Sequence, residues 1–239
     1  MPSSADASRP AACGQCGSLM PRDRPLMPIA DKSITTILFD WDGTLADSAR
    51  MGYHAFEQTF HELGLRFDYG IYEQIYSPNW HLMYAAMELP RNRWRQADDL
   101  WMRHYGQEPI RLVEGAYQTV LELTRRGYRL GVVTSGSASR IRREIGELFL
   151  PSIFQVVICN EDTANKKPHP EGLEKAMKAL DRSPEVCAYV GDSPEDIEMS
   201  KRAGLLSVGV RSDYPCCKRL RNAEPDRYID SIVQLLECF

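Results

Sequence analysis

Acidic side chains follow two of the apolar segments of this sequence directly. Asp40 and Asp42 come after the apolar run 34–39, and Asp192 and Asp196 come after the run 186–190. Two further apolar runs end at polar residues that could bind an anion, which are Thr134, Ser135 and Gly136 after 128–133, and Lys166 and Lys167 after 155–159. If these ends meet, several carboxylates, a hydroxyl and a lysine share one place.

Carboxylates crowded at one place repel each other and take up protons unless a cation neutralises them. Because the ligands are oxygens without a histidine or cysteine cage, the ion that they favour is Mg²⁺. A magnesium ion, a lysine and a hydroxyl together can bind a transferring phosphoryl group. In such a site Asp40 can attack phosphorus, and Asp42 can act as general acid and then as general base.

The elements that must position these residues alternate along the chain. The short apolar runs 34–39, 128–133, 155–159, 186–190 and 205–210 lack polar alternation, which is typical of strands buried on both faces of a parallel sheet. Helical patterns over 137–148, 170–180 and 194–203 separate them. The sequence therefore predicts an α/β fold with a doubly wound, Rossmann-like parallel sheet, whose strands present ligands at their carboxyl ends.

One long segment interrupts this alternation. Residues 48–111 have a helical pattern throughout, although a direct crossover between strands needs only about a dozen residues. We therefore expect three parts: a flexible N-terminal extension (1–33), an α/β catalytic core (34–47 plus 112–239) and an inserted helical cap (48–111). The cap aromatics Trp80, Tyr84, Trp94 and Trp101 are interpreted as its core, and the cap arginines 91, 93 and 95 as a solvated helix start.

Four motifs in the chain resemble those of the haloacid dehalogenase superfamily. They occur in the family's order and are FDWDGTLADS (39–48), VVTSGS (132–137), KKPHP (166–170) and VGDSPEDIEMSKRAG (190–204). The insertion between the first and second motifs is similar to the helical cap of the phosphoglycolate phosphatase-like group. The resemblance implies a hydrolase, a phosphoric monoester phosphatase that acts on a small-molecule phosphate ester.

The resemblance also implies a role for each motif residue. Asp40 becomes the nucleophile that forms aspartyl-phosphate, Asp42 the acid and base, and Thr134, Ser135 and Gly136 bind the phosphoryl group. Lys167 neutralises negative charge on the nucleophile and the phosphate. Lys166 is the alternative for this role and otherwise lies behind the reacting groups. The implied Mg²⁺ ligands are Asp40, Asp192 and the backbone carbonyl of Asp42, with Asp196 behind them.

Other members of the superfamily remain as alternatives. A dehalogenase is disfavoured because halide leaves without the proton that Asp42 would supply. A phosphonate-cleaving enzyme needs a lysine in its cap, and residues 48–111 contain none. A sugar phosphomutase would keep all four motifs and stays open. A non-catalytic regulatory member is less expected, because Asp40, Asp42 and the lysine are all present.

Composition limits the partners and the compartment. The chain has 239 residues and a net charge of −4 from interspersed acids and bases, which gives no case for nucleic acid or an anionic membrane. No apolar run approaches the roughly 20 residues that span a bilayer. The seven cysteines are scattered, including an isolated pair at Cys13 and Cys16, which favours a reducing compartment. We expect a cytoplasmic protein, monomeric or homodimeric.

Overall fold

The computed structural model describes residues 34–107, 109–148, 150 and 152–239. Segment 1–33, which was predicted to be a flexible extension and contains Cys13 and Cys16, lies outside the described residues. Along the described part of the chain, no helix is both long enough and apolar enough to cross a membrane.

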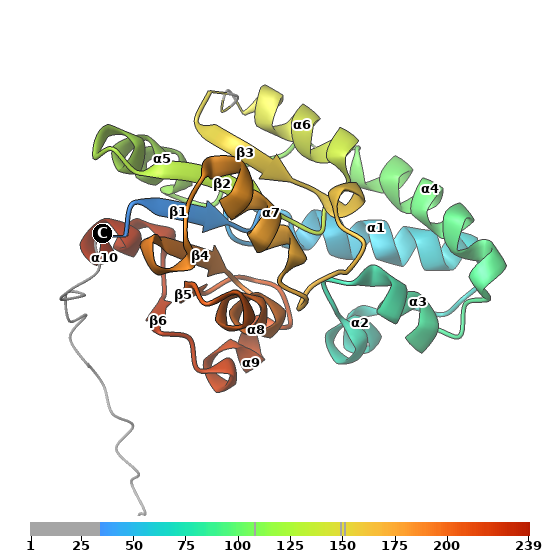
Figure 1. Ribbon diagram of the computed structural model, residues 1–239. Coiled ribbons are helices and arrows are strands. Elements are labelled where there is room, and N and C mark those ends of the chain that lie inside the picture. The colour runs from blue at the N-terminus through green and yellow to red at the C-terminus, as the bar shows by residue number, and fades with distance from the viewer. Residues whose placement is uncertain (1–33, 108, 149, 151) are drawn as a thin grey trace, which may run out of the picture.

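One parallel sheet organises the molecule (Figure 1). Its strands lie in the order β3-β2-β1-β4-β5-β6, so the first strand is central. Their bounds are β1 (Thr36–Phe39), β2 (Arg129–Val133), β3 (Phe154–Ile158), β4 (Cys187–Gly191), β5 (Leu206–Val210) and β6 (Arg227–Ile229). Phe39 pairs with Val132 on one side and Val190 on the other, so β1, β2 and β4 end level with one another.

Helices cover both faces of the sheet because successive side chains of the strands point in opposite directions. Ile37 and Phe39 pack in one apolar cluster with α5 (Ala116–Arg125), α6 (Ala138–Glu147) and α10 (Leu235–Cys238). Leu38 packs in another cluster with α7 (Glu171–Leu180) and α8 (Pro194–Ala203). The predicted doubly wound α/β fold is therefore confirmed.

The remaining helical segments of the core are short. They are α9 (Cys217–Leu220) and the 3-10 helices η2 (Asn160–Asp162), η3 (Pro184–Val186), η4 (Arg221–Ala223) and η5 (Ile232–Gln234).

The inserted segment forms a separate helical cluster at the end of the sheet toward which the strands point (Figure 1). It consists of α1 (Ala49–Glu62), α2 (Tyr69–Ile75), α3 (Trp80–Ala86), η1 (Arg91–Arg93) and α4 (Trp94–Tyr105). The expectation of helix throughout 48–111 was wrong in detail. Gly64 ends the first helical stretch with φ at +78°, and Pro78 and Pro90, which have no N–H to donate, interrupt the later ones.

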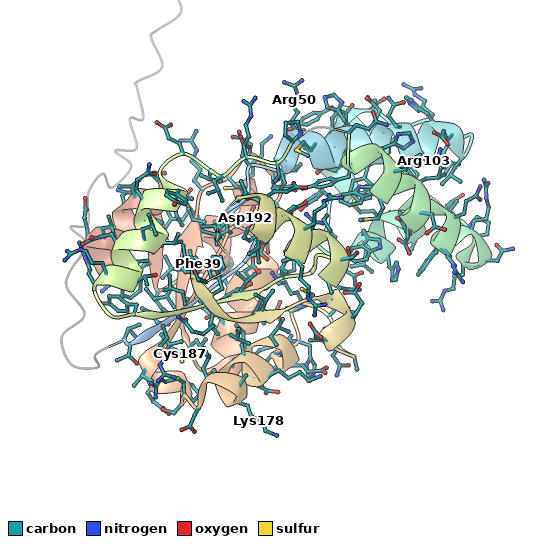
Figure 2. The ribbon with its side chains drawn as sticks, turned by 90° about the horizontal axis from the view of Figure 1, so that it is seen from above. Phe39, Arg50, Arg103, Lys178, Cys187 and Asp192 are labelled. Atoms are coloured by element: carbon teal, nitrogen blue, oxygen red, sulfur yellow. The ribbon has the colours of Figure 1, made fainter. Side chains whose placement is uncertain are left out.

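Two adjacent crossings join this cap to the core. Ala46 and Leu112 form an antiparallel bridge, and the Asp47 N–H donates to the Arg111 carbonyl at 2.9 Å. Within the cap, α1 and α4 pack against each other around an aromatic and aliphatic cluster that includes Phe60. In Figure 2, labelled Phe39 and Cys187 lie in the α/β body and Arg103 on the cap.

Candidate active site

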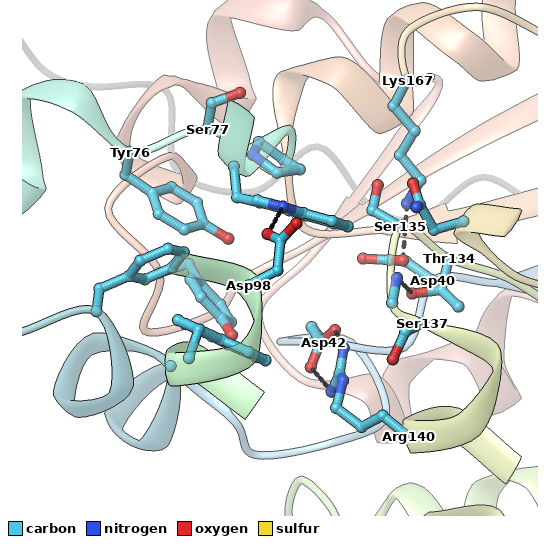
Figure 3. Close-up of a pocket in the computed structure, with 18 of the residues that line it drawn as sticks. Asp40, Asp42, Tyr76, Ser77, Asp98, Thr134, Ser135, Ser137, Arg140 and Lys167 are labelled. Carbon is cyan, nitrogen blue, oxygen red and sulfur yellow. Dashed lines mark hydrogen bonds and ion pairs between the residues drawn. The ribbon is translucent and has the colours of Figure 1, made fainter. Parts of the chain in front are cut away.

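The predicted nucleophile stands at the end of the central strand. Asp40 follows Phe39 directly, and its backbone N–H donates to the Val190 carbonyl at 2.8 Å, so Asp40 continues the hydrogen bonding of the sheet. Thr134 holds the equivalent place after β2, where its N–H donates to the Ile158 carbonyl at 2.9 Å. Because the strands are parallel, both side chains reach the same edge of the sheet (Figure 3).

Lys167 comes to this edge from the loop between β3 and α7. Its Nζ lies 2.7 Å from Asp40 Oδ1 and 2.8 Å from Asp196 Oδ1, and the lysine side chain is buried. The Lys166 ammonium instead donates, at 2.6 and 2.7 Å, to two backbone carbonyls of residues 160–163. The structure therefore brings Lys167 to the carboxylates and uses Lys166 to hold the loop.

The start of α8 fixes the other two acids. Asp196 and Ser193 form a reciprocal helix cap, in which Ser193 Oγ accepts from the Asp196 N–H and donates to the Asp196 carboxylate. Asp192 precedes this cap directly, and its Oδ2 accepts from Ser212 Oγ at 2.6 Å. Both acids are buried: Asp192 is 3% exposed and Asp196 is 0% exposed.

Three of these acids form a cluster that fits a divalent cation. Asp40, Asp192 and Asp196 each offer a carboxylate oxygen, and the three atoms lie within 4.8 Å of one another. Burial raises the pKa of Asp40 to about 7 despite the neighbouring Lys167. Burial, together with the charges of Asp196 and Asp40, also raises the pKa of Asp192 well above its ordinary value. The single charge of Lys167 does not balance three buried acids, and carboxylate oxygens are the donors that Mg²⁺ prefers.

The predicted metal ligands, Asp40, Asp192 and the backbone carbonyl of Asp42 with Asp196 behind them, stay a prediction. In the structure the Asp196 carboxylate lies in one cluster with Asp40 and Asp192. Both Asp196 oxygens already accept hydrogen bonds, Oδ1 from Lys167 and Oδ2 from Ser193. Asp196 therefore holds Lys167 and the start of α8.

A glycine makes room for this cluster. Gly43 adopts a φ of +76°, and a Cβ atom on it would lie 2.3 Å from Asp192 Oδ2 and 2.7 Å from the Tyr214 ring. The turn after β1 can therefore pass close to the acids only with glycine at this position.

The predicted acid and base stands apart from the cluster. The Asp42 carboxylate forms a two-pronged ion pair with Arg140 at 2.5 and 2.9 Å, and accepts from Ser48 Oγ at 2.8 Å (Figure 3). Burial opposes ionisation of Asp42, but the guanidinium outweighs burial and lowers the pKa of this acid below its ordinary value. The pKa values of Asp40 and Asp42 are therefore shifted in opposite directions, although the two residues are only two positions apart.

Arg140 is a site residue that the sequence reasoning missed. It lies on α6, is 4% exposed, and contacts both Asp42 and the buried acid Glu144. Glu144 in turn accepts from Trp41 Nε1 at 2.7 Å. The sequence signal that could have indicated Arg140 is the spacing of α6. Arg140 and Glu144 fall on the same helix face as Ile141 and Ile145, which is the buried face.

A cavity of about 280 Å³ lies between the core and the cap. Its core side contains the predicted phosphoryl-binding residues Thr134, Ser135 and Gly136 together with Asp40 and Lys167. Its cap side contains aromatic rings and one carboxylate, that of Asp98. Figure 3 shows Asp98 and Tyr76 on the cap side and Ser135, Thr134 and Lys167 on the core side.

The cap aromatics have a second role beyond packing. Trp80, Tyr84 and Trp101 belong to the cap cluster as expected, but they also line the cavity. Trp94 stacks on His81 with ring centroids 4.7 Å apart and does not line it. Arginines 91, 93 and 95 are likewise absent from its lining.

The parallel sheet, the acids at its strand ends and the inserted helical cap form the arrangement of an α/β enzyme with a candidate site at the carboxyl edge of the sheet. The chain belongs to the haloacid dehalogenase-like hydrolase family, whose model matches residues 37–210.

Individual relatives agree with this assignment. Pyrophosphatase PpaX of Bacillus mycoides is 29% identical over 85% of this chain and 95% of its own length. A haloacid dehalogenase-like hydrolase of Bacteroides fragilis has the same fold, with a TM-score of 0.78 at 24% identity over 85% of this chain and 100% of its own. CbbY of Rhodobacter sphaeroides, solved in complex with phosphate, gives a TM-score of 0.74 at 25% identity over 84% and 96% of the two chains.

Proposed function

We propose that this enzyme is a Mg²⁺-dependent phosphatase that hydrolyses a small phosphomonoester through an aspartyl-phosphate on Asp40. The observation that carries the proposal is the arrangement around Asp40. One of its oxygens is bound by Lys167, it shares a cluster with Asp192 and Asp196, and Asp42, whose pKa is lowered, stands two residues away. The name of PpaX and the phosphate bound to CbbY support a phosphoryl substrate.

In the first step an Asp40 oxygen attacks phosphorus, a new P–O bond forms, and the bond to the leaving oxygen breaks. The positive charge of Lys167 reduces the electrostatic repulsion between the nucleophile and the phosphate. Thr134 and Ser135 line the cavity beside Asp40, where their hydroxyl and N–H groups can donate to phosphoryl oxygens. When bound, Mg²⁺ supplies further charge neutralisation at the Asp40, Asp192 and Asp196 cluster.

Asp42 moves the proton in both steps. As an acid it donates to the leaving oxygen, and as a base it takes a proton from the water that attacks aspartyl-phosphate. Arg140 holds Asp42 ionised in the described arrangement, which is the form needed for the second step. The first step requires the protonated form of Asp42.

The cavity favours hydrolysis over the mutase alternative. A mutase must bind a second phosphate on its substrate. Among the described residues that line the cavity, only Arg140 and Lys167 carry a positive charge, and each is already paired with an aspartate.

Release of inorganic phosphate from p-nitrophenyl phosphate and a panel of phosphorylated metabolites tests the proposal. We expect turnover with Mg²⁺, loss of turnover in EDTA and its recovery when Mg²⁺ is added back. The Asp40→Asn variant should show neither turnover nor a phosphorylated enzyme. Full activity in excess EDTA, or a phosphoenzyme in Asp40→Asn, would contradict the proposed site.

A further inference from the structure

The cap side of the cavity is made of aromatic rings. Phe56, Tyr76, Trp80, Tyr84 and Trp101 line it together with the thioether of Met102. At about 280 Å³ the whole cavity is smaller than most drug-sized ligand sites, and the phosphoryl group takes part of it. The leaving group must therefore be compact and offer apolar surface to these rings.

One carboxylate interrupts the rings. Asp98, on α4, accepts from Trp80 Nε1 at 2.9 Å and from the Tyr84 hydroxyl at 3.0 Å, and both donors bind the same oxygen, Oδ1. Within the described part of the chain, no donor is assigned to Asp98 Oδ2. Burial raises the pKa of Asp98, although the hydrogen bonds from Tyr84 and Trp80 and the nearby His81 oppose that shift. A hydrogen-bond donor on a ligand would give Asp98 Oδ2 a partner.

The same cavity has no place for a second anion. Its two described cations are bound to Asp42 and Asp40 at the phosphoryl end. The cap arginines lie elsewhere: Arg91 lies over the Trp94 ring, and Arg93 donates to Gln96 and to the Leu63 carbonyl. A carboxylate or second phosphate on the leaving group would therefore face the Asp98 carboxylate at the cap end, away from Arg140 and Lys167.

We propose that the substrate is a phosphomonoester whose leaving group carries a protonated amine on a compact apolar skeleton, and no second anion. The ammonium donates to Asp98 Oδ2 and lies against the aromatic faces, which attract cations. This inference rests on the proposed phosphatase activity. The reaction is unchanged: the phosphoryl group is transferred to Asp40, the P–O bond to the alcohol breaks, and the leaving oxygen takes its proton from Asp42 to give an amino alcohol.

Three benzyl phosphates that differ only in one meta substituent form the test panel. The substituent is aminomethyl, methyl or carboxylate, so the series runs from cation to neutral group to anion at constant ring size. We expect kcat/KM in Mg²⁺ to fall in that order, by about 10- to 100-fold from ammonium to carboxylate. O-phosphoethanolamine against phosphoglycolate repeats the comparison on a smaller skeleton and separates an aliphatic from an aromatic source of the amine.

Two variants assign the preference to Asp98. Asp98→Asn keeps an acceptor for Trp80 and Tyr84 but removes the charge, so the ratio of kcat/KM for the ammonium and carboxylate esters should fall to about 1. Asp99→Asn removes the neighbouring, exposed charge on the same helix and should keep the wild-type ratio. An Asp98→Asn ratio equal to that of the wild type would overturn the inference.

Binding separates this inference from the proposed function. Calorimetry with the Asp40→Asn variant and Mg²⁺ measures the dissociation constants of the three esters without turnover. If wild type hydrolyses none of them but the variant binds the ammonium ester most tightly, the amine site stands and the phosphatase proposal fails. If wild type hydrolyses all three without preference, or prefers the carboxylate, the phosphatase stands and the amine site is wrong.

Discussion

Asp40 and Asp42 show how two identical side chains acquire different chemistry from their surroundings. Asp40 lies among other buried acids, and its pKa is raised to about 7. Asp42 faces the Arg140 guanidinium, and its pKa is lowered. Pairs of acids whose pKa values are driven apart are typical of sites that divide nucleophilic and proton-transfer roles. Arg140 is therefore as much a part of this site as the motif residues are.

Removal of Arg140 should destabilise the protein strongly. Arg140→Met leaves the buried Asp42 and Glu144 without their cation, which costs about 3–5 kcal/mol for a broken buried pair. Adding Glu144→Gln to this variant should recover part of the loss, because one uncompensated charge disappears while Trp41 keeps an acceptor. Denaturant unfolding of the two variants and wild type measures the effect.

A residue on the exposed side of the same helix provides the control. Arg143 pairs with Glu147 at 3.7 Å in a solvent-exposed position, so Arg143→Met should change the free energy of unfolding by less than about 1 kcal/mol. Equal losses for Arg140→Met and Arg143→Met would show that the buried network adds nothing to stability.

The site residues differed in how far the sequence could reveal them. Asp40, Thr134 and Asp192 could be predicted to meet because each follows an apolar run, and ends of parallel strands share one edge. The family resemblance favoured Lys167 and left Lys166 as the alternative, because adjacent residues of a loop have no periodicity that could decide between them. Arg140 was missed because its burial depends on Asp42 and on Tyr105 from the cap, which are distant in sequence.

At the scale of elements, the turn after β1 decides whether the acids can approach one another. Gly43→Ala places a Cβ against Asp192 Oδ2 in a backbone conformation that alanine adopts only at a cost. We expect the concentration of Mg²⁺ needed for half-maximal activity to rise at least about tenfold, since a metal contact costing 1.4 kcal/mol already changes affinity by that factor. Titration of p-nitrophenyl phosphate hydrolysis with Mg²⁺ is the measurement.

The Gly64→Ala variant distinguishes the cost of the positive φ angle from the steric clash that Gly43→Ala adds. It has nearly the same φ, +78°, but a Cβ there meets nothing within 4 Å. Gly64→Ala should therefore lose about 1–2 kcal/mol of stability and keep the wild-type response to Mg²⁺. A normal Mg²⁺ response in Gly43→Ala would mean that this turn does not position the acids.

The elements themselves were predictable to different degrees. The core strands were visible as apolar runs, because burial on both faces leaves no polar alternation. The cap was predicted to be helical throughout 48–111, but connections such as 63–68 and 76–79 separate its helices. Its apolar residues serve the cap interior and the cavity together, so their spacing did not mark where α2 and α3 begin and end.

At the scale of the whole molecule, the question is whether the cap admits water to the phosphorylated enzyme. The cap is joined to the core by two crossings that lie side by side at Ala46 and Leu112, an arrangement that suits a hinge. A mutase would hold the cap closed until the second hydroxyl of its substrate arrives.

Product analysis by ³¹P NMR distinguishes the two outcomes. With hexose monophosphates and amine-bearing esters, we expect inorganic phosphate as the sole phosphorus-containing product, with or without catalytic bisphosphate. The reason is that no unpaired cation among the described cavity residues could hold a second phosphate. An isomeric sugar phosphate that forms only when bisphosphate is present would instead identify a mutase.

The contacts of Arg140 connect the cap to Asp42. Its guanidinium donates to the Tyr105 hydroxyl at 3.1 Å and lies over the Tyr105 ring, so the core residue that pairs with Asp42 also binds the last residue of α4. An outward movement of the cap would break this contact and leave Arg140 with Asp42 and Glu144. The position of the cap is thereby coupled to the surroundings of the acid that we propose as the proton carrier.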